Sequence, residues 1–318
     1  MRINYRNVTS LLFVFTIFSA LYSCQEKESK KDQALNTDTA VNDSSEKLPL
    51  PSKFTPGETF NNYWYAGEAE ITSYKLEQAR YGEIREGNAV LVYVTEPFLP
   101  KKQVKADNQK PNNVSVLKLN ATKNFNTGIY PYSIMQSTFY PVDNNQHAIK
   151  VSASIQEWCG QVYTQINNRN QFEIMSHSYF ESEADENFKL EKTILENELW
   201  TQLRIDPKSL PTGKIDIIPS LEFIRLKHVP LRAYEGNATM NNGNYSIEYP
   251  ELNRTLSIKF NPQFPYEILS WEETFKSGYG ANAQTLTTKA TKLEGIKSAY
   301  WNKNSNSNSK LRKTLQLE

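Results

Sequence analysis

Short runs of alternating hydrophobic and polar residues, separated by Asn, Gly and Pro, fill most of the chain after residue 62. This alternation is typical of β-strands, and the frequent β-branched and aromatic residues also favour strands. Turn residues predict hairpins at Glu86-Gly87-Asn88, at KNFNTG (123–128) and at NNRN (167–170). The predicted strands cover residues 63–74, 79–85, 89–96, 114–122, 129–140, 148–166, 171–181, 215–218, 221–227, 231–239, 245–249, 255–260, 266–275 and 285–293.

One stretch, LEKTILENELWTQLRIDP (190–207), repeats with a helical period, and Pro207 ends the pattern. The apolar residues of its one face are Leu190, Ile194, Leu195, Leu199 and Leu203. Strands joined by short hairpins form antiparallel sheets. We therefore predict a mainly β protein, with a large curved antiparallel sheet or half-barrel and one prominent helix. Two packed β-sheets are the alternative.

The first 24 residues have the pattern of an export signal that ends at a cysteine. Arg2 and Arg6 precede an apolar run at 11–21, which is shorter than the roughly 20 residues needed to span a bilayer. The run ends in Leu-Tyr-Ser-Cys (21–24), which resembles a bacterial lipobox. In proteins that match this pattern, the cysteine thiol is joined to diacylglycerol before the signal is cleaved. We therefore expect residues 1–23 to be a signal peptide and Cys24 to be lipidated, with the membrane as a partner through the lipid.

The residues after Cys24 predict a location and a tether. Gln25 is not the aspartate that favours inner-membrane retention, and Gln-Glu-Lys-Glu (25–28) resembles an export signal of Bacteroidetes surface lipoproteins. We expect the outer membrane, with display on the cell surface as the finer expectation. Residues 24–52 are too poor in apolar side chains to fold alone and predict a flexible tether. Within them, Asp-Thr-Ala (38–40) matches a Bacteroidetes O-glycosylation motif and makes Thr39 a candidate site.

The remaining sequence divides into a β-rich domain at 53–303, with a subdivision allowed near 184–208, and a polar tail at 304–318. Loss of residues 1–23 lowers 36 basic residues to 34, against 35 acidic ones. This balance provides no positive field for nucleic acid, so none is expected as a partner. With Cys24 lipidated, Cys159 has no cysteine to pair with, and three scattered histidines do not predict a metal site. No cofactor is predicted.

Candidate catalytic residues are few. Cys159 and His177 could form a nucleophile and base, but the expected register of the 167–170 hairpin places them on opposite faces. We therefore predict that Cys159 is a buried core residue. The acidic run ESEADEN (181–187) predicts a solvated connector, since its spacing does not fit a calcium loop.

Clustered aromatic residues could serve as stacking platforms for a sugar or an apolar ligand. Tyr63, Trp64 and Tyr65 are the first candidates, and the pairs at 130/132 and 300/301 are others. The alternative is ordinary packing in the sheet, where aromatic residues are common.

The segments YWYAGEAEITSYKLEQARYGEIREGNAVLVYVTEPFLPKKQVKAD (63–107) and HAIKVSASIQEWCGQVYTQINN (147–168) are similar to an uncharacterised family of Bacteroidetes lipoproteins. The resemblance extends over about residues 54–317 and implies no activity or catalytic residue. Members of that family sometimes bear the label septum formation inhibitor Maf. That label belongs to pyrophosphatases with a Ser-x-Ser-Pro-Arg-Arg motif, which this chain lacks.

The expected function is thus a lipid-anchored envelope protein of unknown activity, acting as a non-catalytic binding or assembly factor. Its partner would be an envelope protein, a glycan or a lipid ligand. The alternative is an envelope hydrolase acting on glycan or peptide, because hydrolytic carboxylates need no local sequence motif.

Overall fold

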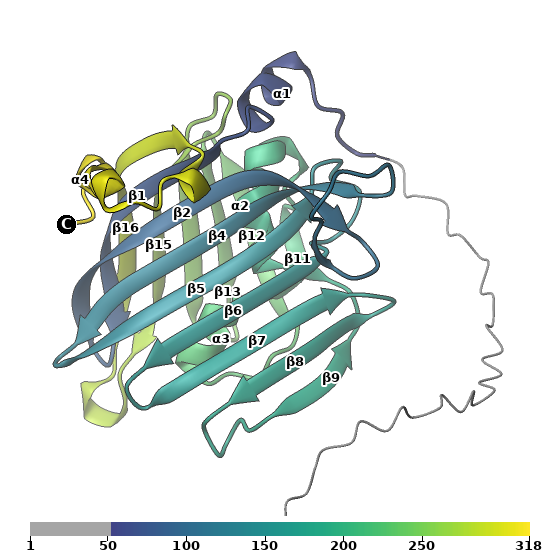
Figure 1. The fold of residues 1–318 in the computed structure, drawn as a ribbon. Helices are drawn as coiled ribbons and strands as arrows, with labels where there is room; N and C mark the ends of the chain where they lie inside the picture. Colours follow the sequence, from purple (N-terminus) through teal and green to yellow (C-terminus); the bar gives the residue numbers. More distant parts are fainter. Residues whose placement is uncertain (1–51) are drawn as a thin grey trace, which may run out of the picture. The chain divides into compact units, whose positions relative to one another are not determined.

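A single strongly curved sheet of sixteen strands forms the computed structural model, which describes residues 52–318 (Figure 1). The strands are β1 (Ala69–Arg80), β2 (Glu83–Leu99), β3 (Val104–Lys105), β4 (Val114–Thr127), β5 (Tyr130–Pro141), β6 (Lys150–Glu157), β7 (Gly160–Asn168), β8 (Phe172–Ser178), β9 (Glu186–Leu190), β10 (Ile194–Leu195), β11 (Gly213–Ile218), β12 (Tyr234–Asn241), β13 (Asn244–Tyr249), β14 (Arg254–Phe260), β15 (Ile268–Ser277) and β16 (Gln284–Ser298). The predicted mainly β class and curved sheet are confirmed.

The sheet does not close on itself. Its order is β10-β11-β12-β13-β14-β15-β16-β1-β2-β4-β5-β6-β7-β8-β9, with β3 paired to β2 at the side. Neighbouring strands are antiparallel except β10 and β11, which are parallel. The two edge strands, β9 and β10, are consecutive in sequence and are separated by residues 191–193 only. The open edges therefore belong to neighbouring parts of the chain.

Two helices lie on the concave side of the sheet: α2 (Glu196–Ile205) and α3 (Leu221–Lys227) (Figure 1). Two others, α1 (Glu58–Trp64) and α4 (Lys310–Thr314), lie near the chain ends, and short 3₁₀ turns are η1 (Pro207–Ser209), η2 (Gly280–Asn282), η3 (Tyr300–Asn302) and η4 (Asn306–Asn308). Ser220 begins α3, since its hydroxyl accepts a hydrogen bond from the Phe223 amide. These two concave-side helices fill the space that the sheet encloses.

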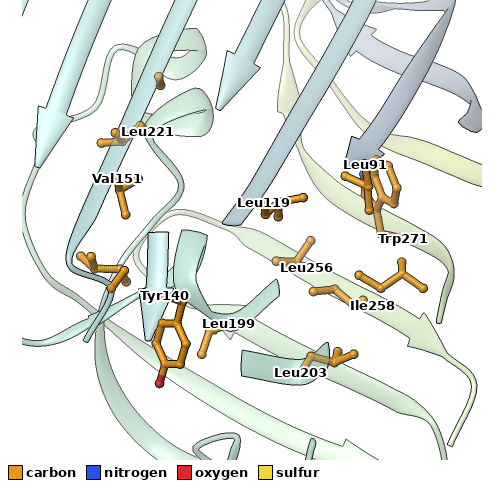
Figure 2. Packing of buried hydrophobic residues seen from close by; sticks show 14 of the residues in the cluster. Leu91, Leu119, Tyr140, Val151, Leu199, Leu203, Leu221, Leu256, Ile258 and Trp271 are labelled. Carbon is orange, nitrogen blue, oxygen red and sulfur yellow. The ribbon is translucent and has the colours of Figure 1, made fainter. Parts of the chain in front are cut away.

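The main core lies between α2 and the inner faces of the strands. Leu199 and Leu203 of α2 are fully buried and point among side chains from opposite parts of the sheet, such as Leu119 and Leu256 (Figure 2). The predicted apolar face of this helix is thus confirmed for its second half. Leu190 and Leu195 belong to β9 and β10 instead, because the edge strands continue up to the helix.

Several predicted elements differ from the structure. Residues 58–64 form α1 where the predicted first strand began, because Phe60 and Trp64, four residues apart, bury one helical face together. Residues 221–227 form α3 rather than a strand. The predicted strand 148–166 is two strands, β6 and β7, which turn at Trp158 and Cys159. A hairpin turn is specified by very few residues. A turn made of apolar residues therefore does not interrupt the hydrophobic pattern and is not predicted from it.

The first hairpin turns at Tyr81 and Gly82, both with positive φ, and not at Gly87 as predicted. Gly87 lies within β2, where a Cβ atom would come 2.2 Å from the carbonyl oxygen of Asn124 in β4. Glycine is therefore needed here for close approach of two strands rather than for a turn.

The polar C-terminal residues contact the domain. Leu315, just after α4, is buried against Ala69, Ile71 and Val94 on the outer face of the sheet. Among residues 52–318, no helix is long and apolar enough to cross a membrane.

Candidate functional site

Of the predicted site residues near the N-terminus, the structure describes Tyr63, Trp64 and Tyr65. Cys24 and Thr39 lie outside the described residues. Trp64 is fully buried and lies beneath the Arg204 guanidinium, 5.1 Å from its ring. Tyr63 is half-buried and donates a hydrogen bond to Glu70, whereas Tyr65 is exposed. The three rings therefore do not form one open face, and a stacking role stays a prediction for Tyr65.

Cys159 is exposed at the β6–β7 turn, so the prediction that it is a core residue is wrong. The predicted register between β7 and β8 is also wrong. The loop between these strands has three residues, and it pairs Tyr163 with His177. The Glu157 carboxylate beside the thiol raises the pKa of Cys159, and His177 pairs with Asp185 at 3.3 Å. A carboxylate neighbour disfavours the thiolate, so this cysteine is not an activated nucleophile.

Charged side chains from α2 and from the neighbouring strands β14 and β15 meet inside the sheet. Arg254 of β14 donates to Glu196 of α2 (Nη2 to Oε1, 2.7 Å) and to Glu273 of β15 (Nε to Oε1, 2.6 Å). The Tyr249 hydroxyl also donates to Glu196. Burial alone would raise the pKa of Glu196, but the adjacent Arg254 charge outweighs it and lowers that pKa.

A second buried pair lies beside the first. Lys123 of β4 contacts Glu222 of α3 at 2.7 Å, and Gln136 of β5 donates to the other carboxylate oxygen at 3.0 Å. Here burial prevails over Lys123, and the pKa of Glu222 is raised. Two carboxylates whose pKa values move in opposite directions are a feature of acid–base sites.

The space between these groups is small. The cavity that they line, together with Trp200 and Trp271, has a volume of about 50 Å³. That is room for a few water molecules. Neither a sugar ring nor a peptide fits, and the carboxylates are already held by cations. The arrangement is that of a buried ion-pair network which orients α2 and α3 against the sheet.

A much larger cavity of about 860 Å³ lies beside the edge strand β9. We call it the seam cavity; its walls come from β7, β8 and β9 on one side and from α3 and the loop to β12 on the other. The apolar lining residues are Val162, Phe188, Leu221, Ile224, Val229, Pro230 and Leu231, and the others are Thr164, Ser176, Ser182, Glu183, Glu186, Asn187, Arg225 and His228. The volume is in the range of small-molecule sites, and the lining combines seven apolar residues with eight polar or charged ones.

Polar contacts cross one end of the seam cavity. Glu183, in the acidic run before β9, accepts from His228 Nδ1 at 2.7 Å and from Arg225 Nη1 at 3.3 Å. The acidic run is thus in part a structural contact and not only a solvated connector. The Arg225 side chain is 9% exposed, and its Nε is buried with no hydrogen-bond partner. Arg225 is also held by the Phe180 ring, which lies 4.3 Å from its guanidinium carbon, so it is a fixed positive charge in the wall of the cavity.

Sequence reasoning missed both the buried network and the seam cavity. Arg254 and Glu196 are 58 residues apart, and Lys123 and Glu222 are 99 apart. Within residues 52–318, no group of three or more His, Cys, Asp or Glu side chains is arranged to hold a metal ion.

Comparison with known proteins gives similarity in shape alone. No protein-family model matches the chain, and no curated protein matches it. A solved structure from Brucella abortus, a beta-barrel-like protein of the domain of unknown function DUF1849, has a TM-score of 0.41 and 7% identity, covering 72% of this chain and 97% of that one. A porin-like protein from Bacteroides uniformis has a TM-score of 0.20 and 8% identity, covering 76% and 99%.

Proposed function

We propose that this protein is a lipid-anchored binding protein of the outer membrane, which holds a small, partly apolar ligand in the seam cavity. The single observation that supports binding is this cavity of about 860 Å³, whose walls combine apolar residues with a few charged ones, Arg225 among them. The lipobox at 21–24 supports the anchor, and the resemblance to Bacteroidetes lipoproteins supports the compartment. The proposal does not assign this chain the pyrophosphatase activity to which the Maf label belongs.

A hydrolase is the second candidate, since the pKa of Glu222 is raised while that of Glu196 is lowered. A general acid and an ionised carboxylate are what glycoside hydrolysis requires. The space at these residues is about 50 Å³, however, and each carboxylate is bonded to a cation. Binding without chemistry is therefore the better supported proposal.

The anchor predicts a simple labelling result. Radiolabelled palmitate should enter the wild-type protein and should not enter the Cys24→Ala variant, because the thiol is the atom that carries the lipid. Labelled protein should fractionate with the outer membrane. Equal labelling of both proteins would contradict lipidation at Cys24.

The seam cavity predicts binding of an apolar anion. The probe is the dye 8-anilinonaphthalene-1-sulfonate, and the protein is the mature chain with Cys24→Ser, which needs no detergent. We expect saturable binding, weakened about tenfold or more by Arg225→Met, because a hydrogen bond to a charged group typically contributes about 1.5–3 kcal/mol. Leu231→Trp should weaken it as well by filling the cavity. Fluorescence titration measures both effects.

Arg232→Met is the matched control, since Arg232 forms an exposed ion pair with Glu251 outside the cavity. It should leave the affinity unchanged. Equal affinity in Arg225→Met, Leu231→Trp and the parent chain would show that the dye does not use the seam cavity. Native mass spectrometry of protein purified from envelopes then tests for a bound natural ligand.

A further inference from the structure

Six hairpin connections lie at one end of the sheet. Neighbouring strands from β13 through β9 alternate in direction, so β13, β15, β1, β4, β6 and β8 all end on the same side. The turns after β4 and β6 lie together at that end in Figure 1. We define the rim as Tyr81, Ile129, Trp158, Tyr179 and Tyr279, which are exposed in these connections, together with the half-buried Tyr130 at the start of β5.

The rim is unusually apolar for a set of turns. The connections after β1, β4, β6 and β15 read Tyr-Gly, Gly-Ile, Trp-Cys and Gly-Tyr-Gly-Ala-Asn-Ala, without a charged residue among them. Exposure is high: 85% for Ile129, 74% for Tyr179, 69% for Trp158 and 64% for Tyr279. Hairpin turns in water usually carry polar residues, so contact with water does not explain why these apolar and aromatic side chains are found in the turns.

The opposite end of the sheet is different. Many of its connections are polar, such as Arg-Asn-Gln (169–171), Glu-Lys-Thr (191–193) and Ala-Asp-Asn-Gln-Lys-Pro-Asn-Asn (106–113). The exposed apolar and aromatic residues at that end, Tyr65, Val104, Tyr300 and Trp301, are 39–45% exposed, less than Ile129, Trp158, Tyr179 and Tyr279 of the rim. The contrast lies between two ends of the same strands. It therefore does not follow from strand composition or from the needs of the core.

Side-chain contacts connect most of the rim into one strip. The Tyr81 and Tyr132 hydroxyls are 2.9 Å apart, and the Tyr132 ring lies 6.0 Å from that of Tyr130. The Tyr130 ring is in turn 6.5 Å from that of Trp158. Tyr179 packs over Gly160, two residues beyond Trp158, where a Cβ atom would come 2.7 Å from the tyrosine ring. These contacts therefore link Tyr81, Tyr130 and Trp158 across neighbouring hairpins, in part through the buried Tyr132.

We propose that the rim docks on a zwitterionic lipid bilayer. Trp and Tyr are enriched at the membrane–water interface, where the ring lies among lipid and the polar atom reaches water. Ile129, at the outermost turn position, adds an aliphatic group that would gain from contact with acyl chains. Ring stacking on a glycan would leave this isoleucine without a role.

The charges near the rim identify the kind of bilayer. The connection after β8 is acidic, with Glu181, Glu183 and Asp185, and in the connection after β13 Glu251 is paired with Arg232. The connections after β1, β4, β6 and β15 are uncharged. Attraction to anionic lipid is therefore not expected, and binding should be driven by apolar contact and respond little to salt.

The rim can reach the bilayer that holds the predicted lipid anchor. The described chain begins at the far end, where the Lys53 amide donates to the Asp143 carbonyl in the β5–β6 connection. The 27 residues between Cys24 and Ser52 span at most about 90 Å, whereas β2 is about 55 Å long. Docking of the rim is independent of any ligand in the seam cavity.

The test uses the mature chain with Cys24→Ser, in which Cys159 is the one remaining cysteine and lies exposed beside Trp158. A nitrobenzoxadiazole label on Cys159 is titrated with phosphatidylcholine–phosphatidylethanolamine vesicles. We expect a blue shift, quenching by lipid-attached quenchers and the same partition coefficient at low and high salt. Ile129→Asp/Tyr279→Asp should lower partition at least tenfold, because two rim hairpins would then have to bury a carboxylate.

Trp301→Asp is the matched control, since Trp301 is 45% exposed but follows β16 at the other end. It should leave partition unchanged, and near-ultraviolet circular dichroism should show that both variants are folded. Unchanged label emission at lipid excess would overturn the proposal, as would an equal effect of Trp301→Asp. Binding to peptidoglycan sacculi without a vesicle response would also overturn it and would assign the rim to glycan.

Discussion

Replacement of Arg254 by alanine is expected to lower the free energy of unfolding by about 3–5 kcal/mol. Arg254 is 2% exposed and its guanidinium bonds Glu196 and Glu273, so its loss leaves two buried carboxylates without a cation. Urea denaturation of the mature chain with Cys24→Ser, with and without the substitution, measures the difference.

The cost of Arg254→Ala should depend on pH with a defined sign. Arg254 holds the pKa of Glu196 in the folded protein below its usual value of 4.5. The stabilisation is therefore fully present above pH 4.5 and is lost as the pH falls through the folded-state pKa. The difference between the two proteins should shrink on acidification.

Arg232→Ala provides the comparison for this prediction. Arg232 also pairs with a glutamate, Glu251, but both side chains are about half exposed. Exposed pairs contribute about 0–1 kcal/mol, so this variant should unfold almost as the parent does. A loss below about 1 kcal/mol for Arg254→Ala would show that the buried network does not stabilise the fold.

The second large effect is expected for Arg204→Met, at about 3–5 kcal/mol. Arg204 of α2 makes two parallel hydrogen bonds to Glu70 of β1, at 2.6 and 2.7 Å, and both side chains are buried. Its guanidinium also lies 4.7 Å from the Tyr93 ring. Removal of the cation leaves the Glu70 charge buried, and the apolar replacement keeps most of the packing.

A double variant separates the charge from the shape at this position. Glu70→Met/Arg204→Met removes both charges, and replacement of a whole buried pair by apolar residues is often close to neutral. We expect it to recover most of the stability that Arg204→Met loses, as measured by urea denaturation. If the double variant is less stable than the single one, the hydrogen bonds of the pair contribute more than the cost of desolvating it.

Many of the strands were predictable because their signal is local. Strands such as β13 and β14 alternate buried and exposed residues along their own sequence, and each lies within a residue or two of its predicted range. The antiparallel order follows from short connections between consecutive strands. The local pattern gave a wrong prediction at Gly87, because glycine occurs both in turns and where two strands approach closely. Gly87 is needed for the close approach of two strands.

By itself, the sequence determined the mainly β class and the apolar face of α2, because each rests on residues close together in the chain. Lipid attachment at Cys24 stays a prediction. Only the tertiary structure decided that Cys159 is exposed, since it lies in the turn between β6 and β7, within the range 148–166 that was predicted as one strand. It alone brought Arg254 to Glu196, and Phe188 of β9 to Arg225 of α3 across the seam cavity. Burial of charge and the shape of a cavity depend on contacts between residues far apart in sequence, and no local pattern records them.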